Sequence, residues 1–163
     1  MLRDRGDFAD AIPAYESAVA ADSTFALAHY RLGEAYGWTE SISPRVAESY
    51  RTARRFADRL PPRDAELLEV SLAYTTADDS ATSRARAAAQ KYPDDPNAAY
   101  LLGEVYFHLP HQAVVPPDSA ALQFDRAVAL DSLYTPAFIH LVDIAFRQAD
   151  SVRIADLLQH EDP

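Results

Sequence analysis

An eight-residue pattern that occurs twice limits the fold more than any other feature of the chain. It reads His29-Tyr-Arg-Leu-Gly-Glu-Ala-Tyr36 at first and Ala99-Tyr-Leu-Leu-Gly-Glu-Val-Tyr106 later. On a helix the leucine and the last tyrosine lie near one face, with the glycine between them. A glycine inside a helix costs about 0.5–1 kcal/mol relative to alanine. Its use at both positions predicts that another helix packs closely against Gly33 and Gly103.

A second pattern flanks these octets. It consists of an alanine, an aromatic residue four positions on, an alanine three positions on and an aspartate four further. It is found at Ala11, Tyr15, Ala18 and Asp22, and again at Ala120, Phe124, Ala127 and Asp131. Together the two patterns predict pairs of helices that are repeated along the chain.

These segments resemble the two helices of the tetratricopeptide repeat, a helix-turn-helix unit of about 34 residues with the signature W-x2-L-G-x2-Y, then A-x3-F, then P. His29 or Ala99 replaces the tryptophan here, and Ser23 or Ser132 replaces the proline. The chain also resembles repeat regions of bacterial signalling proteins. The resemblance implies an all-α fold, a superhelix or solenoid of antiparallel helix pairs, in which neighbouring pairs bury each other's apolar faces.

We expect one array of about nine helices over residues 1–163, with partial repeats at both ends. Ser71 stands where the octets have glycine, which indicates a degenerate middle repeat. The approximate pairs are 1–23, 24–60, 61–94, 95–133 and 134–163.

Capping residues and prolines predict where several helices begin and end. Gly6 and Asp7 separate two helices, and the next helix takes Phe25 to Gly37, followed by a loop that includes Trp38. Ser43 caps a helix from Pro44 to about Leu60, and Asp64 caps the one after it. The segment from Pro110 to Pro117 lengthens a turn, and Asp150 caps a final helix through Gln159.

Composition excludes several classes of function. The net charge of −10 argues against binding nucleic acid through its phosphates. With 4 glycines, a phosphate-binding glycine loop is not expected, and no nucleophile motif occurs, so we predict no enzyme and no cofactor. No apolar run of about 18 residues and no leader occur, so we expect a cytoplasmic protein without a membrane span.

In the family that the chain resembles, the first helix of each pair lines a concave groove where peptides bind. The resemblance therefore implies a non-enzymatic scaffold that binds a protein or peptide, and no nucleic acid or membrane. Aromatic residues with interspersed carboxylates suit a basic or apolar segment. The expected groove residues are Tyr30, Glu34, Trp38, Leu68, Leu72, Thr75, Tyr100, Glu104, Phe107, His108, Ile139, Asp143, Phe146 and Arg147. Alternatively, several of these aromatics pack between neighbouring pairs.

Other possibilities stay open. Some family members grip a C-terminal carboxylate with lysine and asparagine at the positions that Tyr30 and Glu34 occupy here, so we expect no binding of acidic tails. His108 and His111 have the spacing of metal ligands, but no third ligand is evident, and we predict no metal site. The chain alternatively serves as a structural or self-associating segment, a homo-oligomer through uncapped ends, or as a small-molecule sensor near Trp38 or the Pro110–Pro117 loop.

Overall fold

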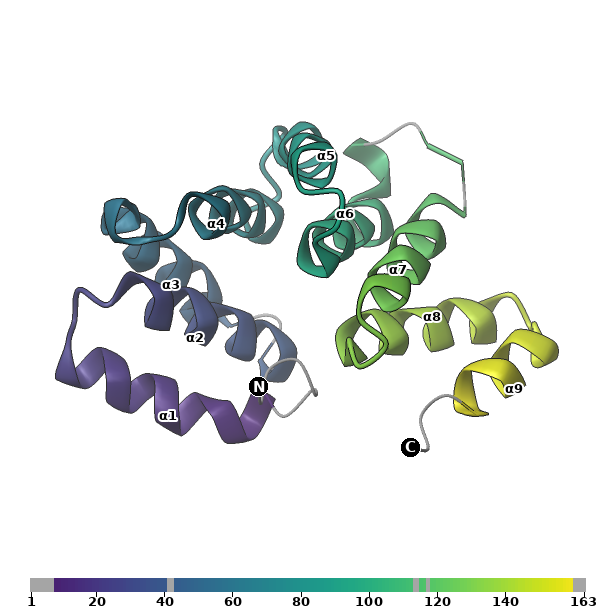
Figure 1. Cartoon of the computed structure of the whole chain (residues 1–163), viewed down its shortest axis with the longest axis horizontal. Helices are drawn as coiled ribbons and strands as arrows, with labels where there is room; N and C mark the ends of the chain where they lie inside the picture. Colours follow the sequence, from purple (N-terminus) through teal and green to yellow (C-terminus); the bar gives the residue numbers. More distant parts are fainter. Residues whose placement is uncertain (1–7, 41–42, 113–114, 117, 160–163) are drawn as a thin grey trace.

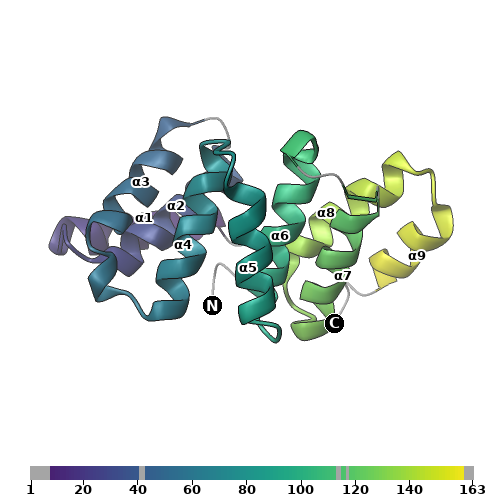
Figure 2. The same ribbon diagram turned by 90° about the horizontal axis from the view of Figure 1, so that it is seen from above.

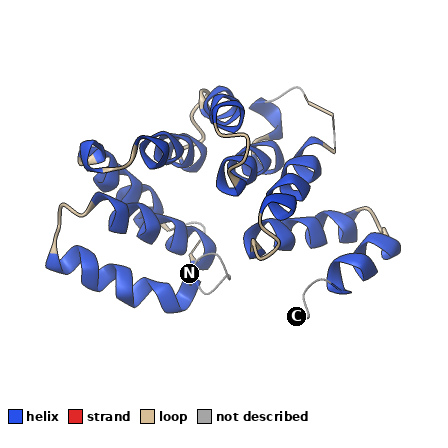
Figure 3. Ribbon diagram, viewed as in Figure 1, coloured by secondary structure: helices blue, strands red, loops and turns tan. Residues whose placement is uncertain are grey.

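The computed structural model describes residues 8–40, 43–112, 115–116 and 118–159, and this part of the chain contains helices and no strand (Figure 3). The predicted boundary at Gly6 and Asp7 lies outside the described residues. The helices are α1 (Phe8–Ala21), α2 (Ala26–Thr39), α3 (Pro44–Arg55), α4 (Pro62–Thr75), α5 (Ala81–Lys91), α6 (Pro96–His108), α7 (Ser119–Leu130), α8 (Thr135–Arg147) and α9 (Ser151–Gln159), with 3-10 turns at Ala57–Arg59 and Pro110–Gln112.

Each helix packs against the next one along the chain, from α1 through α9. The helices follow a curve in Figure 1, and the view from above in Figure 2 shows them standing side by side along its length. On the inner side of the curve lie α2, α4, α6 and α8, while α3 and α5 lie outside (Figure 1). The predicted all-α solenoid is confirmed. None of the helices within the described ranges has both the length and the apolarity needed to cross a membrane.

Close helix contact at the two octet glycines is also confirmed. A Cβ atom on Gly33 would lie 2.5 Å from a ring carbon of Tyr50 in α3, and one on Gly103 would lie 2.6 Å from a ring carbon of Phe124 in α7. Both distances are far below van der Waals contact. The aromatic ring of each outer helix therefore rests directly on the backbone of its inner partner, which explains the use of glycine.

In the middle pair, α4 and α5, the larger side chain at this contact lies on the inner helix and the smaller ones on the outer helix. Ser71 takes the glycine position in α4 and is buried, and its hydroxyl donates to the carbonyl of Leu67 at 3.1 Å. Its outer partner α5 contains no aromatic residue and buries small side chains instead, among them Ala81, Ala85 and Ala88. A larger residue on the inner helix is thus matched by smaller residues on the outer helix.

Two helix ends differ from the sequence-based expectation. The helix expected to stop at Gly37 continues to Thr39, so Trp38 lies in its last turn and not in a loop. The helix expected to reach Leu60 ends at Arg55, because the backbone N–H of Phe56 bonds to the carbonyls of Ala53 and Arg54 and tightens the chain into a 3-10 turn. The predicted caps at Ser43 and Asp150 are present.

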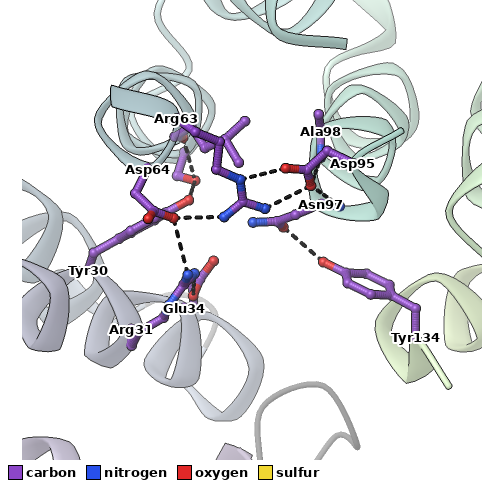
Figure 4. Close-up of polar contacts among 11 residues, drawn as sticks. Tyr30, Arg31, Glu34, Arg63, Asp64, Asp95, Asn97, Ala98 and Tyr134 are labelled. Atoms are coloured by element: carbon purple, nitrogen blue, oxygen red, sulfur yellow. Dashed lines mark hydrogen bonds and ion pairs between the residues drawn. The ribbon is translucent and has the colours of Figure 1, made fainter. Parts of the chain in front are cut away.

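A chain of ion pairs connects the inner helices at one edge (Figure 4). In α2, Arg31 contacts Glu34 at 2.8 Å and Asp64 of α4 at 3.3 Å. Asp64 also contacts Arg63 at 2.7 Å, and Arg63 reaches Asp95 at the start of α6. Asp64 was expected to cap α4, but the helix begins earlier, at Pro62, and the Asp64 carboxylate instead links two arginines.

Asp95 connects this chain of charges to the next helix. Its Oδ1 accepts hydrogen bonds from the backbone N–H groups of Asn97 at 2.9 Å and Ala98 at 3.3 Å, which caps α6. The hydroxyl of Tyr134, just before α8, then donates to Oδ1 of Asn97 at 2.8 Å (Figure 4). Polar contacts therefore hold α2, α4, α6 and α8 in one relative arrangement, which positions the inner surface.

Candidate functional site

A cavity of about 560 Å³ lies among the inner helices. Its size falls within the range of about 300–1,000 Å³ that is typical of ligand sites. Most of its lining comes from α2, α4, α6 and α8, the helices that Figure 1 places on the inner side of the curve. The lining side chains that carry rings or charges are Phe8, Glu34, Trp38, Tyr50, Tyr74, Tyr100, Glu104, His108, Tyr134 and His140.

Trp38 joins the two ends of the curve. Its ring stacks on Phe8 of α1, with centroids 5.2 Å apart and planes at 6°. It also lies 6.4 Å from the ring of Tyr100 in α6 and 5.7 Å from the ring of His140 in α8. Trp38 therefore brings α1 and α2 together with α6 and α8 on the inner surface.

Two carboxylates face the cavity. Glu34 lies on α2, where Arg31 contacts it at 2.8 Å. Glu104 lies in the middle of α6 and is 7% exposed. Nε2 of His140 lies 2.6 Å from Oε1 of Glu104, while the nearest nitrogen of His108 is 3.9 Å away. A buried carboxylate is stable only beside hydrogen-bond donors or positive charge, so Glu104 is a strong acceptor within an aromatic wall.

The phenols around Glu104 are held in their protonated form. Burial, and then the carboxylate of Glu104, raise the pKa of Tyr74 well above its ordinary value, and the pKa of Tyr100 is raised for the same reasons. Burial lowers the pKa of His108, so its ring is neutral at pH 7. The wall therefore offers hydroxyl donors, neutral rings and carboxylate acceptors to a ligand.

Six of the fourteen predicted groove residues line this cavity. Those that do are Glu34, Trp38, Thr75, Tyr100, Glu104 and His108. Tyr30 is instead fully buried, and so is Leu68. Leu72 lies at a separate depression on the outer side with Arg51 and Arg54.

The remaining predicted residues are Phe107, near the end of α6, and four residues along α8. Arg147 contacts Asp143 at 2.8 Å, and its guanidinium group lies 5.1 Å from the centre of the Phe107 ring. Ile139 and Phe146 of α8 are exposed. None of these five residues lines the cavity in the described part of the chain.

Sequence reasoning missed Tyr74 and His140. Tyr74 holds the same repeat position as Tyr36 and Tyr106, but those two tyrosines contact the preceding outer helices. Tyr36 donates to Glu16 of α1 at 2.7 Å, and Tyr106 accepts from Arg86 of α5 at 2.8 Å. Tyr74 faces the cavity because α4 contacts α6 directly, and its ring lies 5.9 Å from that of His108.

Nothing in the sequence identified His140 as a residue of the candidate site. It is not at a position that the family's groove would use, and it lies 36 residues beyond Glu104. Its place beside Glu104 follows from the packing of α8 against the rest of the array, which one sequence does not specify.

Comparison with known proteins gives one family match. Residues 1–37 match the model of the TPR repeat, a range that includes α1 and most of α2. No curated protein matches the chain. The match covers residues 1–37, and the all-helical array of packed neighbours is consistent with the repeated helix pairs of this family.

Proposed function

We propose that the chain is a non-catalytic interaction module that binds a protein segment by taking one of its basic side chains into the inner cavity. Repeats of this family suggest a protein–protein interaction module. The cavity lined by Trp38, Tyr74 and Tyr100, with the carboxylates of Glu34 and Glu104, is the observation that carries the proposal.

The chemistry of the wall favours an arginine or lysine side chain. A cation over an aromatic face gains about 0.5–2 kcal/mol, more when water is excluded. Glu34 adds a carboxylate to the lining of the cavity, and the chain as a whole has a net charge of −10. Complementary charge speeds association and disfavours acidic partners.

The test uses an eight-residue peptide with a central arginine between leucines, capped at both ends, and the same peptide with uncharged citrulline. Calorimetric titration is expected to show at least tenfold weaker binding of the citrulline peptide, a loss of about 1.4 kcal/mol. Equal affinities would contradict the proposal.

Two variants test whether the peptide binds on the inner surface. Glu34→Gln and Trp38→Ala are expected to weaken binding of the arginine peptide three- to tenfold or more, because the first removes a negative charge and the second an aromatic face from the cavity. The matched control is Glu48→Gln, an exposed glutamate on the outer helix α3, which should leave the affinity unchanged. If Glu48→Gln weakens binding as much as Glu34→Gln, the peptide binds elsewhere.

The volume of the cavity, about 560 Å³, also supports a second candidate, the sensing of a small organic cation. Arginine methyl ester, titrated alone, separates the two functions. If it binds as tightly as the whole peptide, flanking contacts contribute nothing and the small-molecule function is favoured. Self-association is a third outcome, and sedimentation at several concentrations would reveal it as a dimer that blocks peptide binding.

A further inference from the structure

Three metal-ligating side chains converge at one corner of the cavity. Glu104 and His108 lie four residues apart on α6 and therefore on the same face of that helix. His140 reaches them from α8. One ligand atom from each residue lies within 4.8 Å of the other two.

One carboxylate oxygen of Glu104 accepts no hydrogen bond at this corner of the cavity. Its Oε1 is buried and makes no hydrogen bond, although Nε2 of His140 lies 2.6 Å from it. A buried carboxylate oxygen without a donor costs free energy unless a cation compensates it. This orphaned oxygen is a second observation, independent of the spacing of the three residues.

The two histidines differ in mobility, which allows the cluster to tighten. The ring of His140 is stacked on Phe124, with centroids 4.7 Å apart, and lies 5.2 Å from Phe107, so it is fixed. His108 is at the end of α6, and its side chain is 42% exposed. Two ligands of one zinc ion are about 3.3–4.2 Å apart, given bonds of about 2.0–2.1 Å. The three ligand atoms lie within 4.8 Å of one another, and Nε2 of His140 is 2.6 Å from Oε1 of Glu104. Binding one ion therefore requires His108 to rotate inward and the Glu104 carboxyl to shift slightly away from His140.

We propose that Glu104, His108 and His140 bind one divalent transition-metal ion, with Zn²⁺ as the natural probe. Two imidazoles and one carboxylate are a donor set that suits Zn²⁺, and three protein ligands leave one position open. Since all three residues line the cavity, the open position faces the space that a ligand would enter.

The proposal goes beyond the binding of a peptide. A bound ion neutralises the carboxylate of Glu104, so it would compete with a basic side chain for the same corner. Zn²⁺ is therefore expected to weaken binding of the arginine peptide. It should not abolish this binding, because the charge of Glu34 still attracts the peptide.

The experiment titrates the chain, prepared without a histidine tag, with Zn²⁺ by calorimetry and with Co²⁺ by visible absorption. We expect one equivalent of Zn²⁺ and the absorption spectrum of four-coordinate Co²⁺. His108→Ala, at an exposed position, should fold normally and bind Zn²⁺ at least tenfold more weakly, and Glu104→Gln should do the same. The matched control is His111→Ala, an exposed histidine near the same helix end, which should leave the affinity unchanged.

Absence of Zn²⁺ binding, or equal losses in His108→Ala and His111→Ala, would overturn the metal site. If Glu104→Gln fails to fold, the Zn²⁺ affinity of His108→Ala still tests the metal site. The two proposals fail separately, because the arginine peptide is titrated without metal, so an absence of Zn²⁺ binding by the natural chain leaves the affinity for the peptide unchanged. Failure of the peptide to bind leaves the stoichiometric Co²⁺ spectrum in place.

Discussion

Gly103 shows how a single position sets the distance between two helices. Glycine is unfavourable inside a helix, and α6 accepts the cost because the ring of Phe124 lies where a side chain would be. Gly37 is different, since a Cβ there would meet its nearest neighbour, Val46, at an ordinary 3.9 Å. The same residue type thus has a packing role in one place and none in another.

We predict that Gly103→Ala destabilises the chain by about 1–3 kcal/mol, because overpacking outweighs the better helix propensity of alanine. Gly37→Ala is the control and should be neutral or stabilising by up to about 1 kcal/mol. Urea unfolding measures both changes. Equal effects of the two substitutions would contradict close contact at Gly103.

Asp95 makes stability depend on pH in a definite direction. Burial opposes its charge, but its bonds with Arg63 outweigh burial and hold its pKa below the ordinary value. In the unfolded chain an aspartate has a pKa of about 3.9. Between the two values the unfolded chain takes up a proton and the folded chain does not, so this contribution is present above about pH 4 and is lost as the pH falls through the lower, folded value.

Asp95→Asn keeps a capping side chain and removes the charge. It should cost about 1–3 kcal/mol at pH 7 and lose less stability than the natural chain as the pH falls below 4. Asp94→Asn, at the exposed neighbouring position, is the control and should stay within about 0.5 kcal/mol. Unfolding by urea at pH 7, 5, 4 and 3 measures this, and parallel pH profiles for the natural chain and Asp95→Asn would rule out the role of the ion pair.

Periodicity and capping residues predicted which segments are helical, but not where every helix ends. Ser43 and Asp150 lie before their helices as expected, because a cap is a local interaction. The end of α3 and the extension of α2 through Trp38 were not predicted, because they depend on the packing of neighbouring helices. Asp64 is of a residue type that often caps helices, but its carboxylate forms an ion pair with Arg31, 33 residues away in sequence.

The alanines of α5 provide a test of how tightly this helix is packed. Ala85 is fully buried, and Ala87 on the other face is exposed. Ala85→Leu should destabilise the chain by about 1–3 kcal/mol, and Ala87→Leu should stay within about 0.5 kcal/mol. Thermal and urea unfolding measure both. Tolerance of leucine at position 85 would show that α4 and α5 are less tightly packed than described.

Curvature of the array decides which residues meet, and this part of the candidate site was hardest to predict. The family resemblance pointed to Glu34, Trp38, Tyr100 and Glu104, which the cavity does bring together. It could not place Trp38 against His140, because that contact joins the first and last inner helices. Nor could it separate Asp143 and Arg147 from the cavity, since the face that α8 presents to the cavity depends on how the whole helix packs in the array.

The most direct test of the account follows the indole N–H signal of Trp38 by NMR during titration with the arginine peptide. The chain has 1 tryptophan, so the signal needs no assignment by mutation. A basic side chain that enters the cavity should shift this signal in proportion to occupancy, and the citrulline peptide should shift it much less. Saturating binding that leaves the Trp38 signal unmoved would show that the inner cavity is not the binding site.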